Sequence, residues 1–115
     1  MLTREQILAM DSGPELDKLV AEKVMGWTSI AKLRWKDPKG VTNFVPDYST
    51  DISAAWEVVE KMSRGKTDCS FVLQFHFERY YAKFGEVPID NKRWNSYLTA
   101  PEAICKAALL STLEV

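Results

Sequence analysis

The sequence predicts an α+β domain in which an antiparallel sheet of about five strands packs between helices, in the order α-β-β-α-β-β-β-α. Apolar and polar residues alternate over several short segments, as they do along half-buried strands. Other segments place apolar residues at helical spacing directly after capping signals. The connections are short, which favours antiparallel pairing. With 115 residues, 46% of them hydrophobic and 27% charged, residues 1–115 are expected to form one domain.

The first half carries two helix signals followed by a hairpin. A capping box at Thr3–Gln6 predicts a short first helix, and Pro14 suits the first turn of a second helical segment. Gly26 is expected to end that segment in the left-handed conformation. Residues 31–45 alternate like two strands joined by the turn residues Asp37–Gly40, and they predict a β-hairpin.

The second half contains a helix near residues 51–63, three further strands and a C-terminal helix. The strands are expected at Cys69–Phe77, Tyr80–Glu86 and Lys92–Leu98. A capping box at Thr99–Glu102 opens the last helix. Apolar residues surround nearly all of that helix: Ala103, Ile104, Ala107, Ala108, Leu109, Leu110 and Leu113. Such a helix is buried, either in this domain or against a second copy of it, so we expect self-association.

Composition narrows the range of partners. The net charge is −1, which gives no overall attraction to nucleic acid or to anionic lipid. No apolar run approaches the roughly 20 residues of a membrane-spanning helix, and we expect no secretory signal. Cys69 and Cys105 have neither metal-site spacing nor disulfide density, which fits a reducing cytoplasm. We therefore expect a cytoplasmic protein with no nucleic-acid polymer and no membrane as partner.

The patterns of common catalytic sites are missing. His76 is the only histidine, it lies within a predicted strand, and no serine or cysteine elbow accompanies it. His76 and Glu78 together supply too few ligands for a metal site. No glycine-rich phosphate loop is present. We expect no enzyme activity, no metal and no cofactor.

A group of cations and aromatic rings on the predicted strands could bind a nucleotide. Arg79, Tyr81 and Lys83 should share one face of their strand. A nucleotide needs cations for its phosphates and a flat ring beside its base, and this face offers both. A solvated sheet face explains the same pattern. Asn91 and Arg93 have the same two explanations, since amide side chains read base edges and also stabilise turns.

Two further candidate ligand-binding residues lie near helices. Lys106 has apolar neighbours, which is explained either by an ion pair with Glu102 four residues earlier or by an anionic ligand at a subunit junction. Tyr48 precedes Ser49–Asp51, which could orient a phosphate at a helix N-terminus or simply cap the helix. Both alternatives stay open from the sequence.

Three runs of residues resemble the phage ABA sandwich family: Ala21–Trp27, Tyr48–Met62 and Thr99–Leu109. The resemblance implies an antiparallel sheet between helical layers and self-association, as a dimer or a higher oligomer up to a hexamer. Characterised members are anti-defence proteins that sequester cyclic ADP-ribose isomers of the bacterial Thoeris system intact, and some also hold cyclic oligonucleotides. In such members a cation of the C-terminal helix contacts the ligand, and Lys106 matches it. The usual arginine is replaced here, which loses bidentate phosphate recognition.

Two hypotheses from different classes follow. The first is a phage or prophage anti-defence protein that sequesters a cyclic nucleotide immune signal, without cleaving it, in the cytoplasm of the infected bacterial host. The second is a small phage structural or protein-interaction module with no small-molecule ligand. A nucleotide hydrolase is a weaker third, because the sequence shows no base, nucleophile or metal set.

Overall fold

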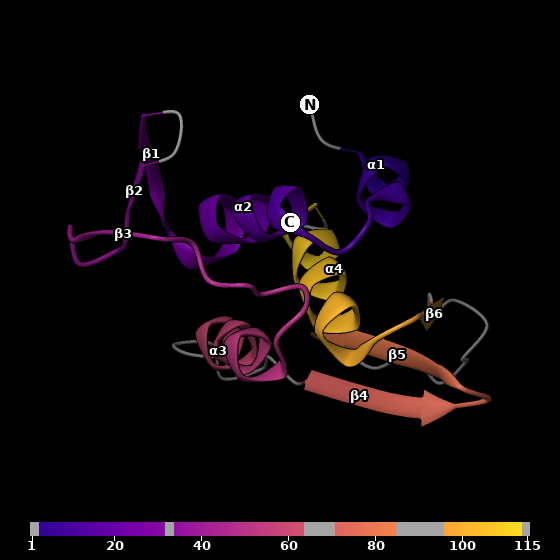
Figure 1. Cartoon of the computed structure of the whole chain (residues 1–115). Helices are drawn as coiled ribbons and strands as arrows, with labels where there is room; N and C mark the ends of the chain where they lie inside the picture. The colour runs from indigo at the N-terminus through magenta and orange to yellow at the C-terminus, as the bar shows by residue number, and fades with distance from the viewer. Residues whose placement is uncertain (1–2, 32–33, 64–70, 85–95, 114–115) are drawn as a thin grey trace.

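The structure is a computed structural model that describes residues 3–31, 34–63, 71–84 and 96–113 (Figure 1). Its helices are α1 (Arg4–Ala9), α2 (Pro14–Val20), α3 (Ile52–Ser63) and α4 (Ala100–Leu113), and a π-helical turn, η1 (Ala21–Met25), continues α2. The strands described are β1 (Thr28–Ala31), β2 (Arg34–Lys36), β3 (Thr42–Asn43), β4 (Phe71–His76), β5 (Arg79–Phe84) and β6 (Ser96–Tyr97).

Helix α4 lies at the centre of the molecule. Strand β5 packs on one side of it, and α1, α2 and α3 contact it from other directions (Figure 1). Every side chain from Pro101 to Leu110 is buried within the one chain. The helix is therefore buried in its own domain. Between Pro101 and Leu110 it leaves no exposed apolar surface for a second copy to cover. Self-association stays a prediction, and it needs another surface.

The described strands form two three-stranded antiparallel sheets, in the orders β1-β2-β3 and β4-β5-β6. The α+β class is confirmed, but the prediction of one five-stranded sheet is wrong. The hairpin expected over residues 31–45 gains a strand, because β1 begins at Thr28 and pairs with β2 across a register shift between Ser29 and Ala31. Strand partners are chosen by contacts distant in sequence, which alternation alone does not report.

The second sheet follows the predicted alternation. Tyr80, Ala82 and Phe84 face the core, as expected for β5. Strand β4 ends at His76, because Phe77 and Glu78 form the turn to β5 with positive φ angles of 51° and 60°. The predicted strand at 92–98 is confirmed only at Ser96–Tyr97, and residues 92–95 lie outside the described residues, as do 69–70 and 85–86 at the ends of the other two.

Local signals placed most helix ends correctly. Thr3 and Gln6 form the reciprocal capping box, and Gly26 ends η1 with a φ of 83°. Asp51 caps α3 by accepting a hydrogen bond from the Ser53 amide at 3.0 Å. At α4, Thr99 accepts from the Glu102 amide, but the Glu102 carboxylate accepts from Leu98 and so leaves the expected box incomplete.

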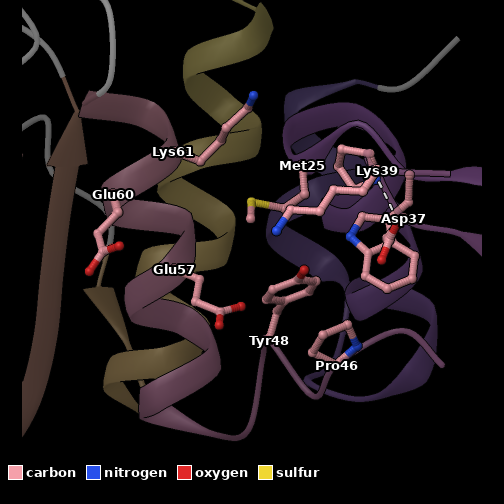
Figure 2. Close-up of a pocket in the computed structure, with 10 residues that line it drawn as sticks. Met25, Asp37, Lys39, Pro46, Tyr48, Glu57, Glu60 and Lys61 are labelled. Carbon is pink, nitrogen blue, oxygen red and sulfur yellow. Dashed lines mark hydrogen bonds between the residues drawn. The ribbon is translucent and has the colours of Figure 1, made fainter. Parts of the chain in front are cut away.

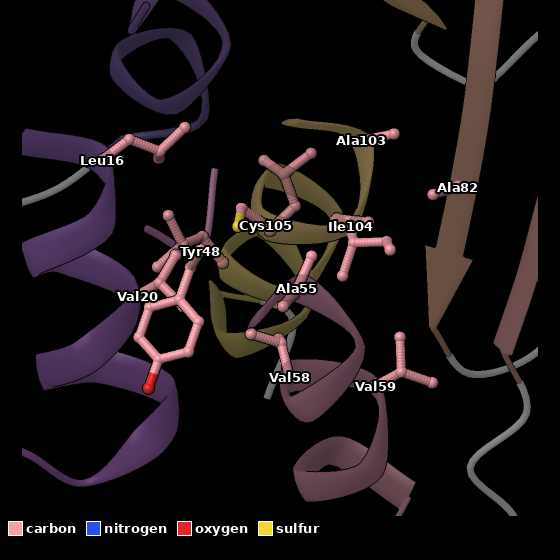
Figure 3. Close-up of a cluster of buried hydrophobic side chains, with 14 of the residues drawn as sticks. Leu16, Val20, Tyr48, Ala55, Val58, Val59, Ala82, Ala103, Ile104 and Cys105 are labelled. Atoms are coloured by element: carbon pink, nitrogen blue, oxygen red, sulfur yellow. The ribbon is translucent and has the colours of Figure 1, made fainter. Parts of the chain in front are cut away.

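The core joins α2, α3 and α4 (Figure 3). On α3 the buried residues are Ala55, Val58 and Val59, whereas Ile52 and Trp56 are about half exposed. Helical spacing in the sequence predicts a different apolar stripe, formed by Ile52, Ala55, Trp56, Val59 and Met62, so the buried stripe is rotated from the predicted one. Cys105 is buried in this core, and Cys69 lies outside the described residues. Within the described ranges, no helix is long and apolar enough to cross a membrane.

Candidate ligand-binding site

Lys106 is held inside the fold. Its side chain is 4% exposed, and Nζ donates a hydrogen bond to the Leu8 carbonyl at 3.2 Å. The Glu102 carboxylate lies 3.6 Å from Nζ, and the centroid of the Tyr97 ring lies 6.0 Å from it. The pair with Glu102 that the sequence allowed is therefore present within α4. The hydrogen bond to Leu8 ties α4 to α1. A ligand contact by Lys106 would require this arrangement to open.

Glu102 completes the junction. Its exposed fraction is only 9%, so both partners of the ion pair are buried. The carboxylate accepts hydrogen bonds from the Ser12 hydroxyl at 3.1 Å and from the Leu98 amide at 3.1 Å. A buried ion pair whose remaining polar atoms are hydrogen-bonded is a structural element. We refer to Ser12, Glu102 and Lys106 as the buried junction.

Arg79, Tyr81 and Lys83 lie on the other side of the second sheet. They alternate along β5 with the core-facing residues, and all three are half-buried. Arg79 donates a hydrogen bond to the Ser96 carbonyl at 3.3 Å, which links β5 to the start of β6. Lys106 lies near Tyr97, which pairs with core-facing Tyr80, so the sheet separates Lys106 from these three side chains. Within one chain these four candidates cannot form a single site.

Asn91 and Arg93 lie outside the described residues. Tyr48, the last candidate, is in a different place from all the others. Its ring is 1% exposed and packs in the core beside α2, α3 and α4, while its hydroxyl reaches a pocket (Figures 2 and 3).

This pocket has a volume of about 470 Å³ and lies between η1, the β2–β3 turn and α3 (Figure 2). Its lining residues are Met25, Trp27, Asp37, Pro38, Lys39, Pro46, Tyr48, Glu57, Glu60 and Lys61. In Figure 2 Glu57 faces Tyr48 from α3, and Lys39 extends toward the same space from the turn. Apolar walls with a few convergent polar groups are typical of small-molecule sites of this size. We call it the Tyr48 pocket.

The Tyr48 hydroxyl is oriented by its surroundings. The Trp27 side chain donates a hydrogen bond to it, because an indole nitrogen can only donate. This bond uses an acceptor site of the hydroxyl and leaves its own proton for another partner. Burial raises the pKa of Tyr48 to about 12; the bond from Trp27 opposes the rise and the charge of Glu57 adds to it. At neutral pH Tyr48 is therefore a hydrogen-bond donor at the base of the pocket.

Local backbone features position the segments that line the Tyr48 pocket. The π-helical turn η1 and the left-handed Gly26 lead directly from Met25 to Trp27, and short π-helical segments are frequent at functional sites. In the opposite wall the Asp37 carboxylate accepts from the Lys39 and Val41 amides, each at 2.9 Å. Gly40 follows with a φ of 87°. The turn predicted from Asp37–Gly40 is thus confirmed, and it carries Lys39 to the pocket.

The charged lining residues are three acids, Asp37, Glu57 and Glu60, and two lysines, Lys39 and Lys61. In Figure 2 Glu57 and Lys39 point toward the space above Tyr48, whereas Glu60 points away from it. Carboxylates accept hydrogen bonds from hydroxyl groups, and lysines attract phosphates. The pocket therefore suits a ligand that carries both hydroxyls and a small number of phosphates. No cluster within the described ranges has the three His, Cys, Asp or Glu side chains that a metal ion would need.

Sequence reasoning missed most of this pocket. Glu57, Glu60 and Lys61 lie at spacings of three and four residues, so the sequence alone could have shown that they share a face of α3. Trp27 follows a helix-ending glycine, and Lys39 lies in a predicted turn. Nothing in the local sequence indicates that these segments meet α3.

Comparison with known proteins establishes the family. The model of the phage ABA sandwich domain matches residues 18–109, and this chain belongs to that family. A crystal structure of a phage protein from Bacillus cereus ATCC 14579 is similar, with a TM-score of 0.64 and 31% sequence identity over 90% of this chain and 93% of that one. No curated protein matches the sequence. The family prediction is confirmed, and the anti-defence activity stays a prediction.

Proposed function

We propose that this protein binds and sequesters a cyclic nucleotide immune signal, without cleaving it, in the cytoplasm of an infected bacterium. The observation that carries the proposal is the Tyr48 pocket, which joins a buried tyrosine donor to two lysines and three carboxylates. The resemblance to sequestering anti-defence proteins supplies the class of ligand. The pocket supplies a place for it that does not require the buried junction to open.

The charge of the lining favours a cyclic ADP-ribose isomer over a cyclic oligonucleotide with three or more phosphates. Such an isomer carries two phosphates, which Lys39 and Lys61 can neutralise, and ribose hydroxyls, which the carboxylates can accept from. A cyclic oligonucleotide of three or more phosphates would add negative charge beside Asp37, Glu57 and Glu60. A volume of about 470 Å³ is within the range of small-molecule sites, which is roughly 300–1,000 Å³.

The test is retention and intact recovery of the ligand. We expect the protein to hold a cyclic ADP-ribose isomer through gel filtration and to release it unchanged on heating, as chromatography of the supernatant would show. Recovery of linear ADP-ribose would establish hydrolysis instead. Failure to retain any cyclic nucleotide would contradict the proposal and favour an interaction module.

Variants then locate the site. Lys39→Ala and Lys61→Ala should each weaken binding about tenfold or more, because each removes a charge-assisted hydrogen bond. Lys36→Ala is the matched control, since Lys36 is exposed on β2 and does not line the pocket. If Lys106→Met weakened binding while Lys39→Ala and Lys61→Ala did not, the ligand would lie at the buried junction instead.

An interaction module is the second candidate function, and the tip of the β4–β5 hairpin favours it. Phe77 is 83% exposed and adopts the left-handed conformation, which is uncommon for a bulky residue. Leu98, after β6, is also largely exposed. Phe75, near the end of β4, is a third large apolar residue that is mostly exposed. An exposed apolar patch marks an interaction surface, so these residues are the candidates for one.

A further inference from the structure

Strand β4 is an unprotected sheet edge among the described strands. It lies at one end of the order β4-β5-β6 and pairs with β5 through six consecutive residues without a bulge. Natural edge strands are usually protected by charged residues, proline, bulges or short length. β4 reads Phe-Val-Leu-Gln-Phe-His and has none of these, whereas β1 in the other sheet has four residues and a register shift.

One face of this edge is apolar along its whole length. Phe71, Leu73 and Phe75 share the core side of β4; the first two are half-buried, and Phe75 is 63% exposed. The ring of Trp56 on α3 meets Phe71 edge-on at 6.1 Å and is itself about half exposed, so the apolar surface continues onto the helix. The exposed part of this surface needs a cover that the described part of the chain does not supply.

We propose that a second copy of this chain covers it, by antiparallel pairing of β4 with β4 of the partner subunit. A twofold axis perpendicular to the sheet relates two such strands and keeps the apolar faces of both on the same side. The symmetry requires a residue to lie at the axis. The proposal does not depend on the ligand.

Leu73 is the residue that the side-chain pattern places at the axis. With Leu73 there, Phe71 of each copy lies opposite Phe75 of the partner subunit, and all three apolar positions are paired. An axis at Gln74 would pair only two of these positions and would place two amides opposite each other. Pairing through Leu73 also brings the exposed Phe75 toward Trp56 across the interface, and the two sheets become one of six strands.

The first experiment is sedimentation velocity of the full chain at micromolar concentration. We expect a dimer, and we expect Phe75→Lys to raise its dissociation constant at least about thirtyfold, because an apolar contact near the centre is replaced by a charge. Phe77→Lys is the control, since this phenylalanine is even more exposed, lies beyond the end of β4 and should leave the dimer intact. A monomeric wild type, or a dimer that Phe75→Lys does not weaken, would overturn the proposal.

Cysteine cross-linking tests the register, with Cys69 replaced by serine and Cys105 retained because it is buried. Opposed residues of antiparallel strands have Cα atoms about 4.5–5.5 Å apart, within the range of a disulfide. Leu73→Cys should therefore form a covalent dimer on mild oxidation, whereas Gln74→Cys should not. Cross-linking through Gln74→Cys alone would place the axis elsewhere and contradict the register. Circular dichroism of each variant confirms that the chain is folded.

Discussion

Lysines in two regions of this molecule differ in what surrounds them. In the buried junction, Lys106 has a carbonyl and a carboxylate within 3.6 Å and almost no exposed surface. In the Tyr48 pocket, Lys39 and Lys61 line an open space and are exposed. A buried ammonium group must have its partners inside the protein, because leaving water costs several kcal/mol. An exposed one can exchange water for a ligand. If the proposed function is correct, Lys106 should contribute to stability, and Lys39 and Lys61 should contribute to ligand binding.

The largest expected effect is that of Lys106→Ala on folding. The substitution leaves the Glu102 carboxylate buried without its cation and should lower the free energy of unfolding by about 3 kcal/mol. Urea denaturation measures it. Lys61→Ala is the matched control from the pocket and should change stability by less than about 0.5 kcal/mol.

A double substitution distinguishes lost packing from uncompensated charge. Lys106→Met combined with Glu102→Gln removes both charges at similar volume, and most of the lost stability should return. If Lys106→Ala and Lys61→Ala lowered the free energy of unfolding by equally small amounts, the buried junction would not differ from the Tyr48 pocket in its contribution to stability.

Ser49→Ala should have the next largest effect. The buried Ser49 hydroxyl donates to the Asp17 carboxylate at 2.6 Å and accepts from the Gly13 amide at 2.8 Å. Alanine leaves both groups short of a partner, which should cost about 2 kcal/mol in urea denaturation. Ser53→Ala, on the exposed side of α3, is the control and should be nearly silent. If Ser49→Ala did not change the free energy of unfolding, water would have replaced the hydroxyl, and the site would not count as buried.

The sequence predicted features that depend on neighbouring residues and missed those that depend on distant ones. The end of η1 at Gly26 and the turn at Asp37–Gly40 follow from local backbone chemistry, and both were predicted. The main partner of Lys106 that was missed is the carbonyl of Leu8, 98 residues away in sequence. Tyr48 was a candidate, but the reason it borders a pocket is the arrival of Trp27 from another segment. Alternation likewise indicated strands without showing that they belong to two sheets.

Asp17→Asn should have a smaller effect that depends on pH. Burial raises the pKa of Asp17 above 3.8, and the hydrogen bonds from Ser49 only partly oppose this. The folded state therefore holds this proton more tightly than the unfolded chain does, and the contribution of Asp17 to stability falls as pH rises from 3.8 through the raised value. Asparagine can accept the same bonds and has no proton to lose.

The gain from Asp17→Asn should thus be absent below this window, grow across it and stay constant at neutral pH. Urea denaturation at a pH below, within and above the window measures the gain. A gain that does not change with pH would show that ionisation of Asp17 costs the fold nothing.

The smallest expected effect on stability is that of Tyr48→Phe, and it tests both sides of the contrast at once. The ring stays in the core, and water in the pocket can accept the Trp27 hydrogen bond, so the free energy of unfolding should fall by about 0.5–1 kcal/mol.

In the wild type Tyr48 should ionise with a pKa of about 12, and its contribution to stability should fall as pH rises from 10 through that value. Ultraviolet titration should lose this transition in Tyr48→Phe and keep it in Tyr81→Phe, whose ring lies in β5. Binding of a cyclic ADP-ribose isomer should weaken about tenfold in Tyr48→Phe and stay unchanged in Tyr81→Phe, because Tyr48 carries the hydroxyl among the described lining residues of the pocket. Unchanged binding together with the lost transition would leave Tyr48 as a core residue whose hydroxyl borders the pocket without recognising a ligand.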